Sequence, residues 1–115
     1  MIVSKLQGGL GNQMFQYAIG RHLSSKYNRK FYLDDRFFNG SNRNFSLDNF
    51  SNTIIDTNIN SIQTSLPFKK IDDSFEYKDI ENTIDINYYL DGYWQSEKYF
   101  EESSDLIRND FQPNE

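Results

Sequence analysis

The hydrophobic residues of the first 34 positions change their spacing twice. Residues 2–6 form a short, mostly apolar run, which predicts a buried strand. Apolar residues then recur at helical intervals from position 13 onward, which predicts an amphipathic helix that ends at Tyr27, before Asn28: Met14, Phe15, Ala18, Ile19 and Leu23. Residues 30–34 predict a second strand. Strand, helix and strand in succession form a βαβ unit, so we expect the two strands to be parallel.

The rest of the chain carries weaker patterns. Residues 39–65 are rich in Asn, Ser and Thr and predict loops, with one short strand at 53–55. Residues 66–85 predict irregular or short-strand structure, and the aromatic run 88–94 predicts another strand. Ser96 is suited to cap a helix that Pro113 ends, with a buried stripe formed by Tyr99, Phe100, Leu106, Ile107 and Phe111.

Composition narrows the class of protein. A chain of 115 residues forms one domain at most, or a piece of a larger one. The net charge of −5 and the lack of any Lys/Arg cluster exclude non-specific nucleic-acid binding. The absence of cysteine excludes disulfides and thiolate metal sites. No segment approaches the ~20 apolar residues of a membrane span, and the chain starts on a strand rather than a signal peptide, so we expect a cytoplasmic protein.

The glycine-rich segment Gly8–Gln13 carries the clearest chemistry. A strand-to-helix turn presents free backbone N–H groups at the positive end of the helix, where phosphate binds readily. Glycines let a ligand approach the main chain closely. Three interpretations stay open: a phosphate or sugar-nucleotide site, a turn that only packs, and a dinucleotide fingerprint. The last departs from G-x-G-x-x-G because Met14 replaces the third glycine, although Asp34 and Asp35 lie where a ribose-binding acid falls.

Two longer blocks resemble one known family. The run from Lys5 to Ala18 (KLQGGLGNQMFQYA) and the run from Leu90 to Phe100 (LDGYWQSEKYF) resemble, in this order, two motifs of the α-1,2-fucosyltransferases. Weaker similarity surrounds residues 31–34 and 45–47. The resemblance spans essentially the whole chain.

The resemblance implies an α/β fold, here a partial Rossmann-like N-terminal domain of a GT-B glycosyltransferase. It implies transfer of L-fucose from GDP-fucose to the 2-hydroxyl of a galactoside, with inversion, without a metal and without a cofactor beyond the donor. It also admits peripheral association with the inner face of the membrane. By the same likeness the substrate-binding residues are Gly9, Leu10, Gly11, Asn12 and Gln13, and Trp94 and Gln95 are candidate acceptor contacts. No residue is assigned as the catalytic base.

One departure limits this expectation. Family members carry a His-x-Arg-Arg-x-Asp motif that holds the donor pyrophosphate, and this chain has one histidine, His22, and no Arg-Arg pair. We therefore interpret residues 1–115 as the N-terminal, acceptor-side part of the enzyme, with the C-terminal donor-binding domain absent and no activity alone. A standalone sugar- or nucleotide-binding module, a truncated product without function and an NAD-binding domain remain the alternatives. His22 is expected to pack within the helix, and Asp34, Asp35, Asp72 and Asp73 to be strand-end or loop charges.

Overall fold

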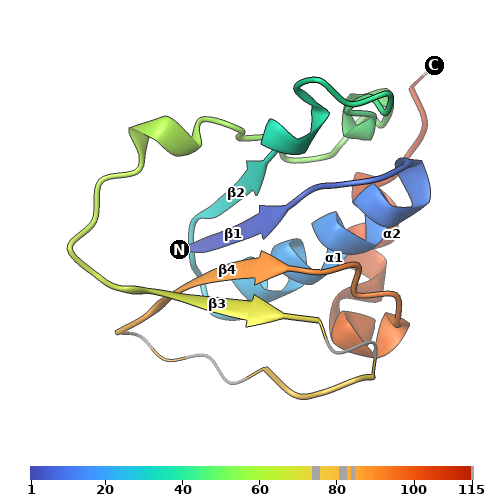
Figure 1. Cartoon of the computed structure of the whole chain (residues 1–115). Coiled ribbons are helices and arrows are strands. Elements are labelled where there is room, and N and C mark those ends of the chain that lie inside the picture. Colours follow the sequence, from blue (N-terminus) through green and yellow to red (C-terminus); the bar gives the residue numbers. More distant parts are fainter. Residues whose placement is uncertain (74–75, 81–82, 84, 115) are drawn as a thin grey trace.

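The computed structural model describes residues 1–73, 76–80, 83 and 85–114. Four strands form one parallel sheet: β1 (Ile2–Lys5), β2 (Phe31–Asp34), β3 (Phe68–Asp72) and β4 (Asn87–Asp91). Their spatial order is β2-β1-β4-β3, so β1 and β4 are neighbours at the centre (Figure 1). The predicted α/β fold class is confirmed, and so is the predicted parallel pairing of β1 with β2.

Both helices lie on one face of the sheet (Figure 1). Helix α1 (Leu10–Lys26) packs on β1 and β2, and α2 (Ser104–Asp110) packs against α1. The core under α1 contains Ile2, Ile19, Tyr88, Leu90 and Trp94, which are at most 1% exposed. Tyr17 joins the two helices, because its hydroxyl donates to Asp110 Oδ2 over 2.6 Å. Burial and that hydrogen bond raise the pKa of Tyr17.

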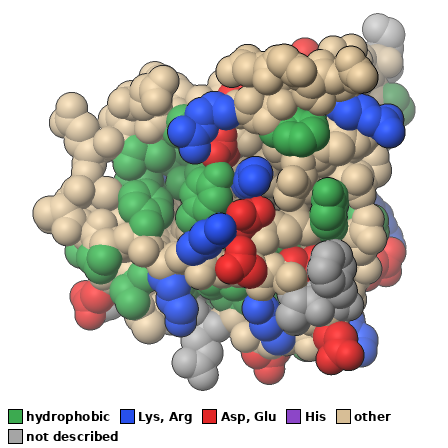
Figure 2. Space-filling model, viewed as in Figure 1, with side chains coloured by type: hydrophobic (Ala, Val, Ile, Leu, Met, Phe, Trp, Pro, Cys, Tyr) green, Lys and Arg blue, Asp and Glu red, His purple; other side chains and the backbone are tan. Residues whose placement is uncertain are grey.

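Among the described residues, no α-helix lies over the opposite face of the sheet. Side chains alternate between the faces of a strand, and Ser4 donates to the backbone of α1 from the helix side. Val3 and its register partners Tyr32 and Tyr89 therefore belong to the other face. Figure 2 shows hydrophobic and charged side chains gathered there. Within the part of the chain that the structure describes, α-helices therefore cover one face of this sheet, whereas parallel sheets usually carry helices on both faces.

The predictions from the sequence were wrong for three elements. Residues 53–55 form no strand, although Leu33 N–H donates to Asp56 O just beyond them. The strand expected over 88–94 ends at Asp91. The single helix expected after Ser96 is two 3₁₀ turns, Glu97–Tyr99 and Glu101–Ser103, followed by α2. The interruption lies at Phe100, whose φ of −141° is not helical and whose ring packs on Phe15.

Gly20 sets how closely α1 approaches the sheet. A Cβ at this position would lie 2.4 Å from Cε1 of Phe31 and 3.2 Å from Cβ of Ser4. In the dinucleotide fingerprint the third glycine provides this close packing, whereas here Gly20, six residues after Met14, provides it. Among the residues described, no helix combines the length and the apolar character that crossing a bilayer requires.

Gly20→Ala should lower the free energy of unfolding by about 1–3 kcal/mol, because the added methyl group overpacks the interface with Phe31. Gly11→Ala is the matched control, since a Cβ there meets nothing within 4 Å, and it should be neutral or stabilising by up to about 1 kcal/mol. Urea denaturation of both variants measures the difference. Equal effects of the two substitutions would contradict the proposed packing.

Candidate functional site

The carboxyl ends of the four strands form one charged edge of the sheet. The strands end at Lys5, Asp34, Asp72 and Asp91, so every terminal residue is charged. Asp34 and Asp72 are strand-end charges as expected from the sequence. In open α/β sheets, ligands bind outside the carboxyl ends of the strands. A ligand site is therefore expected at the loops that leave this edge after β1 and β4.

The glycine turn after β1 is shorter than the sequence predicted. Helix α1 already begins at Leu10, so only Gly8 and Gly9 lie outside it. Gly8 has φ +82°, and a Cβ there would lie 2.6 Å from Asn12 Nδ2, so the position requires glycine. Gly9 is the N-cap and brings no capping side chain. No capping side chain therefore occupies the amides at the start of α1.

The amides at the start of α1 are available at this turn. The first helical hydrogen bond runs from Gln13 N to Gly9 O, which leaves the N–H groups of Leu10, Gly11 and Asn12 without helical acceptors. Leu10 and Gly11 are exposed, and the first turn contains no acidic residue. The positive end of a 17-residue helix therefore faces solvent at the carboxyl edge of the sheet.

Gln13 differs from the other residues predicted to bind substrate, because its side chain is buried. Its side chain is fully buried, and Nε2 donates to Gly8 O and to Asn44 O, at 3.1 and 2.9 Å. Oε1 accepts from Ser46 N at 2.9 Å. The carboxamide is occupied by the backbone, so it holds the loop 44–46 beside the glycine turn and offers no polar atom to a ligand.

The two sequence blocks that resemble the fucosyltransferases meet in space. The buried Gln16 side chain accepts from Gln7 N at 2.9 Å and donates to Gly92 O at 3.0 Å. Closer to solvent, Gln95 Nε2 donates to Asn12 Oδ1 at 2.7 Å. Segments about 80 positions apart in the sequence thus line one edge, with Asn12 and Gln95 as its exposed amide pair.

Trp94 lies apart from that pair. Its side chain is fully buried and packs edge-on against Tyr99, with ring centroids 5.3 Å apart. Its backbone has φ +57°, and its N–H donates to Asp73 Oδ2 at 2.9 Å. Trp94 Nε1 has no hydrogen-bond partner among the described residues. The structure therefore brings Gln95 to the glycine turn and places Trp94 in the core.

Arg43 is a site residue that sequence reasoning missed. Its Nη1 lies 3.3 Å from the position that a Cβ on Gly9 would occupy, so the guanidinium stands directly over the glycine turn. A lone arginine in a loop rich in Asn and Ser gives no signal of this position. The contacts of Gln13 to Asn44 and Ser46 hold the adjoining loop there.

Asp34 is fully engaged beside the glycine turn. Oδ1 accepts from Arg36 N and Nε, and Oδ2 accepts from Arg36 Nη2 and the Tyr89 hydroxyl. A carboxylate offers about four acceptor positions, so little remains for a ribose hydroxyl. Burial alone would raise the pKa of Asp34, but the hydrogen bonds from Arg36 and Tyr89 outweigh it and lower the pKa to about 2.

The other strand ends form an ion-pair ladder. Lys70 lies 3.2 Å from Asp91 and 3.6 Å from Asp72, and Lys5 lies 3.8 Å from Asp91. These pairs are partly exposed and contribute little to stability individually. Within the described residues, no group of three His, Asp or Glu side chains is placed to hold a metal ion.

Asp34→Asn should reduce stability in a pH-dependent manner. Because the folded pKa of about 2 lies below the ordinary 3.8, ionised Asp34 contributes stability that is complete above about pH 4 and is lost as the pH falls towards 2. The variant should therefore be less stable than the wild type at pH 6, and the gap should close between about pH 4 and 2. Asp35→Asn, outside the Arg36–Tyr89 network, is the control. A gap independent of pH would contradict the assignment.

No family model matches the chain, and no solved structure matches it. The alpha-1,2-colitosyltransferase of Escherichia coli is 32% identical over 131 aligned residues, which cover 98% of this chain and 45% of that enzyme. The chain thus spans less than half the length of this curated relative. Over nearly its whole length, the chain is similar to a glycosyltransferase.

Proposed function

We propose that the chain forms the N-terminal, acceptor-side part of a GT-B glycosyltransferase, in which the glycine turn and the loop after β4 make one wall of the sugar-nucleotide cleft. The observation that carries this proposal is the pair of contacts Gln16–Gly92 and Asn12–Gln95, which joins the two motif blocks at the carboxyl edge of the sheet. The similarity to a colitosyltransferase supports the reaction class.

Each group on this wall has a chemical part in the proposal. The N–H groups of Leu10, Gly11 and Asn12, which have no acceptor within α1, would donate to phosphate oxygens of a nucleotide-sugar. Arg43 adds a full positive charge over Gly9, where it offsets charge on the departing nucleoside diphosphate. The amide pair Asn12–Gln95 both donates and accepts, which suits sugar hydroxyls. Gln13 positions the loop 44–46, and Trp94 anchors the loop after β4 in the core.

The first candidate donor is GDP-fucose, and the proposed acceptor is the 2-hydroxyl of a galactoside. The name of the E. coli relative favours a second candidate donor, a nucleotide-linked colitose. Colitose is L-fucose without its 3-hydroxyl, so the two donors differ by one hydrogen-bonding group. A site built to bond that hydroxyl discriminates strongly against the deoxy sugar, whereas an apolar site does not. Direct comparison of the two donors therefore decides between them.

Catalysis is expected to need more than these residues. The chain lacks the arginine motif that holds the donor pyrophosphate in the enzymes it resembles. Incubation of the purified chain with GDP-fucose and lactose should yield no fucosylated product, whereas a product would overturn the proposed inactivity. Binding without turnover would also leave the standalone-module alternative in place, and loss of all binding would favour a product without function.

Arg43→Ala should weaken binding of GDP and GDP-fucose at least about threefold, because a charge-assisted hydrogen bond to phosphate is lost. Titration calorimetry at millimolar nucleotide measures this change. Arg108→Ala, which removes an exposed arginine from α2, is the charge-matched control and should leave the affinity unchanged. If both variants lose affinity equally, only net charge matters, and Arg43 has no specific role. NAD that binds as tightly as GDP-fucose would favour the dinucleotide alternative.

A further inference from the structure

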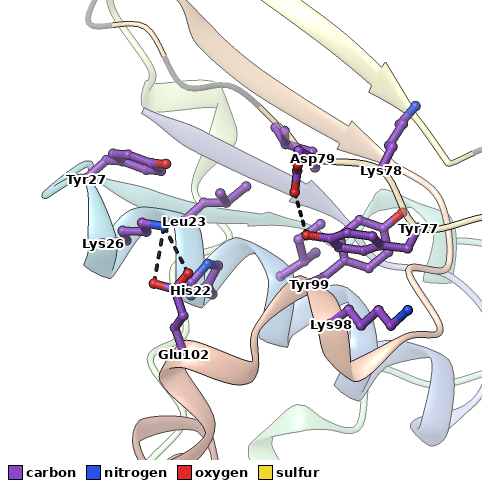
Figure 3. Close-up of a pocket in the computed structure, with 12 residues that line it drawn as sticks. His22, Leu23, Lys26, Tyr27, Tyr77, Lys78, Asp79, Lys98, Tyr99 and Glu102 are labelled. Carbon is purple, nitrogen blue, oxygen red and sulfur yellow. Dashed lines mark hydrogen bonds and ion pairs between the residues drawn. The ribbon is translucent and has the colours of Figure 1, made fainter.

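A second cavity lies at the far end of α1 and plays no part in the proposed cleft. It encloses about 280 Å³ between the last turns of α1, the segment 76–80 and the turns that follow Ser96 (Figure 3). His22 and Lys26 contribute from α1, more than three turns beyond the glycine turn. At a rise of ~1.5 Å per residue, roughly 20 Å of helix separates the two places.

The cavity has an apolar floor and aromatic walls. Ile19 and Leu23 of α1 lie at its base, and both are buried. The rings of Tyr77 and Tyr99 stand on one side with centroids 5.0 Å apart and planes inclined by 54° (Figure 3). Inclined rings do not form the parallel-sided slot that a flat nucleobase needs on both faces. They present an apolar wall to one side of a non-planar ring.

The charges around the cavity are already paired. Lys26 lies 3.2 Å from Glu102, Lys98 lies over the Tyr77 ring at 5.7 Å, and Lys78 donates to Asp72 O outside the cavity. The Tyr77 hydroxyl donates to Asp79 at 2.6 Å. A phosphate anion would lie beside the carboxylates of Glu102 and Asp79, which repel it, and would compete with Glu102 for Lys26. Hydroxyl groups, which both donate and accept, can join these pairs without breaking any.

We propose that this cavity is a binding subsite for a neutral pyranose sugar, separate from the sugar-nucleotide cleft. The volume supports a small ligand, since drug-sized ligands occupy pockets of about 300–1,000 Å³. One face of the sugar ring would lie against Tyr77 and Tyr99, and its hydroxyls would bond the rim pairs Lys26–Glu102 and Tyr77–Asp79. The subsite does not depend on the function proposed above, because it shares no residue with the glycine turn.

Titration with methyl β-D-galactopyranoside, methyl α-L-fucopyranoside and lactose at millimolar concentration, followed by NMR, tests the subsite. At least one sugar should shift the ring resonances of Tyr77, Tyr99 and His22 saturably. Inorganic phosphate should not shift them. No sugar response at these rings, or a response to phosphate alone, would overturn the proposal. A sugar that shifts only the amides of Gly9–Gly11 binds the other cleft, and this result would also overturn it.

Variants of Tyr77 separate its ring from its hydroxyl. Tyr77 is 46% exposed, so Tyr77→Ala should leave the fold intact. The substitution should weaken sugar binding about tenfold, because the aromatic wall is lost. Tyr77→Phe retains the ring, and its sugar affinity should fall only about threefold, because the hydrogen bond to Asp79 is lost. Phe37→Ala removes another exposed aromatic and should have no effect. Wild-type affinity in Tyr77→Ala would contradict the subsite, while GDP-fucose binding at Gly9–Gly11 reports on the other site independently.

Discussion

The buried carboxamide of Gln16 is the interaction on which the geometry of the site depends. A buried amide must satisfy both its donor and its acceptor, and this one does so with Gln7 N and Gly92 O. Those groups belong to the loops that leave the two central strands. One side chain on α1 therefore fixes the glycine turn and the loop after β4 relative to each other. Loss of either partner would leave a buried polar group without a hydrogen bond, which is costly.

The sheet order explains why this junction lies where a ligand can reach it. The chain adds β2 on one side of β1, crosses to the far edge for β3 and returns to place β4 beside β1. The loops after β1 and β4 are consequently adjacent at the carboxyl edge. Asp73 secures the second loop, because Oδ2 accepts from the amides of Tyr93 and Trp94. Gly92 permits this approach, since a Cβ there would lie 2.2 Å from Asp73 Cβ.

The sequence predicted the parts of the fold that local pattern determines. The βαβ unit followed from apolar spacing, and its first turn lies in the predicted glycine-rich segment, where the structure gives Gly8 a positive φ. Strand β3 (Phe68–Asp72) gave a weak pattern because it is an edge strand, exposed at four of its five residues. The break at Phe100 and the positive φ of Trp94 depend on distant partners, Phe15 and Asp73, which no local pattern encodes.

The candidate site was predictable to a similar extent. The glycine turn and Gln95 were identified from the motif blocks, and the structure places them together. Which amide side chains are exposed and which bond the backbone was not predictable from the sequence. Gln13 and Gln16 have the same chemistry as Asn12 and Gln95, yet burial on α1 commits them to the backbone. Arg43 lies over the turn on a loop that Gln13 holds through Asn44, a distant contact that no local pattern encodes.

In the proposed cleft, the glycine turn and the loop after β4 bind the ligand as one wall. An amide NMR titration of the isotopically labelled chain with GDP-fucose tests this directly. We expect the backbone amides of Leu10, Gly11 and Asn12 and the side-chain amide of Gln95 to shift together, with one common dissociation constant. Shifts confined to other surfaces, or movement of the glycine turn without Gln95, would contradict it.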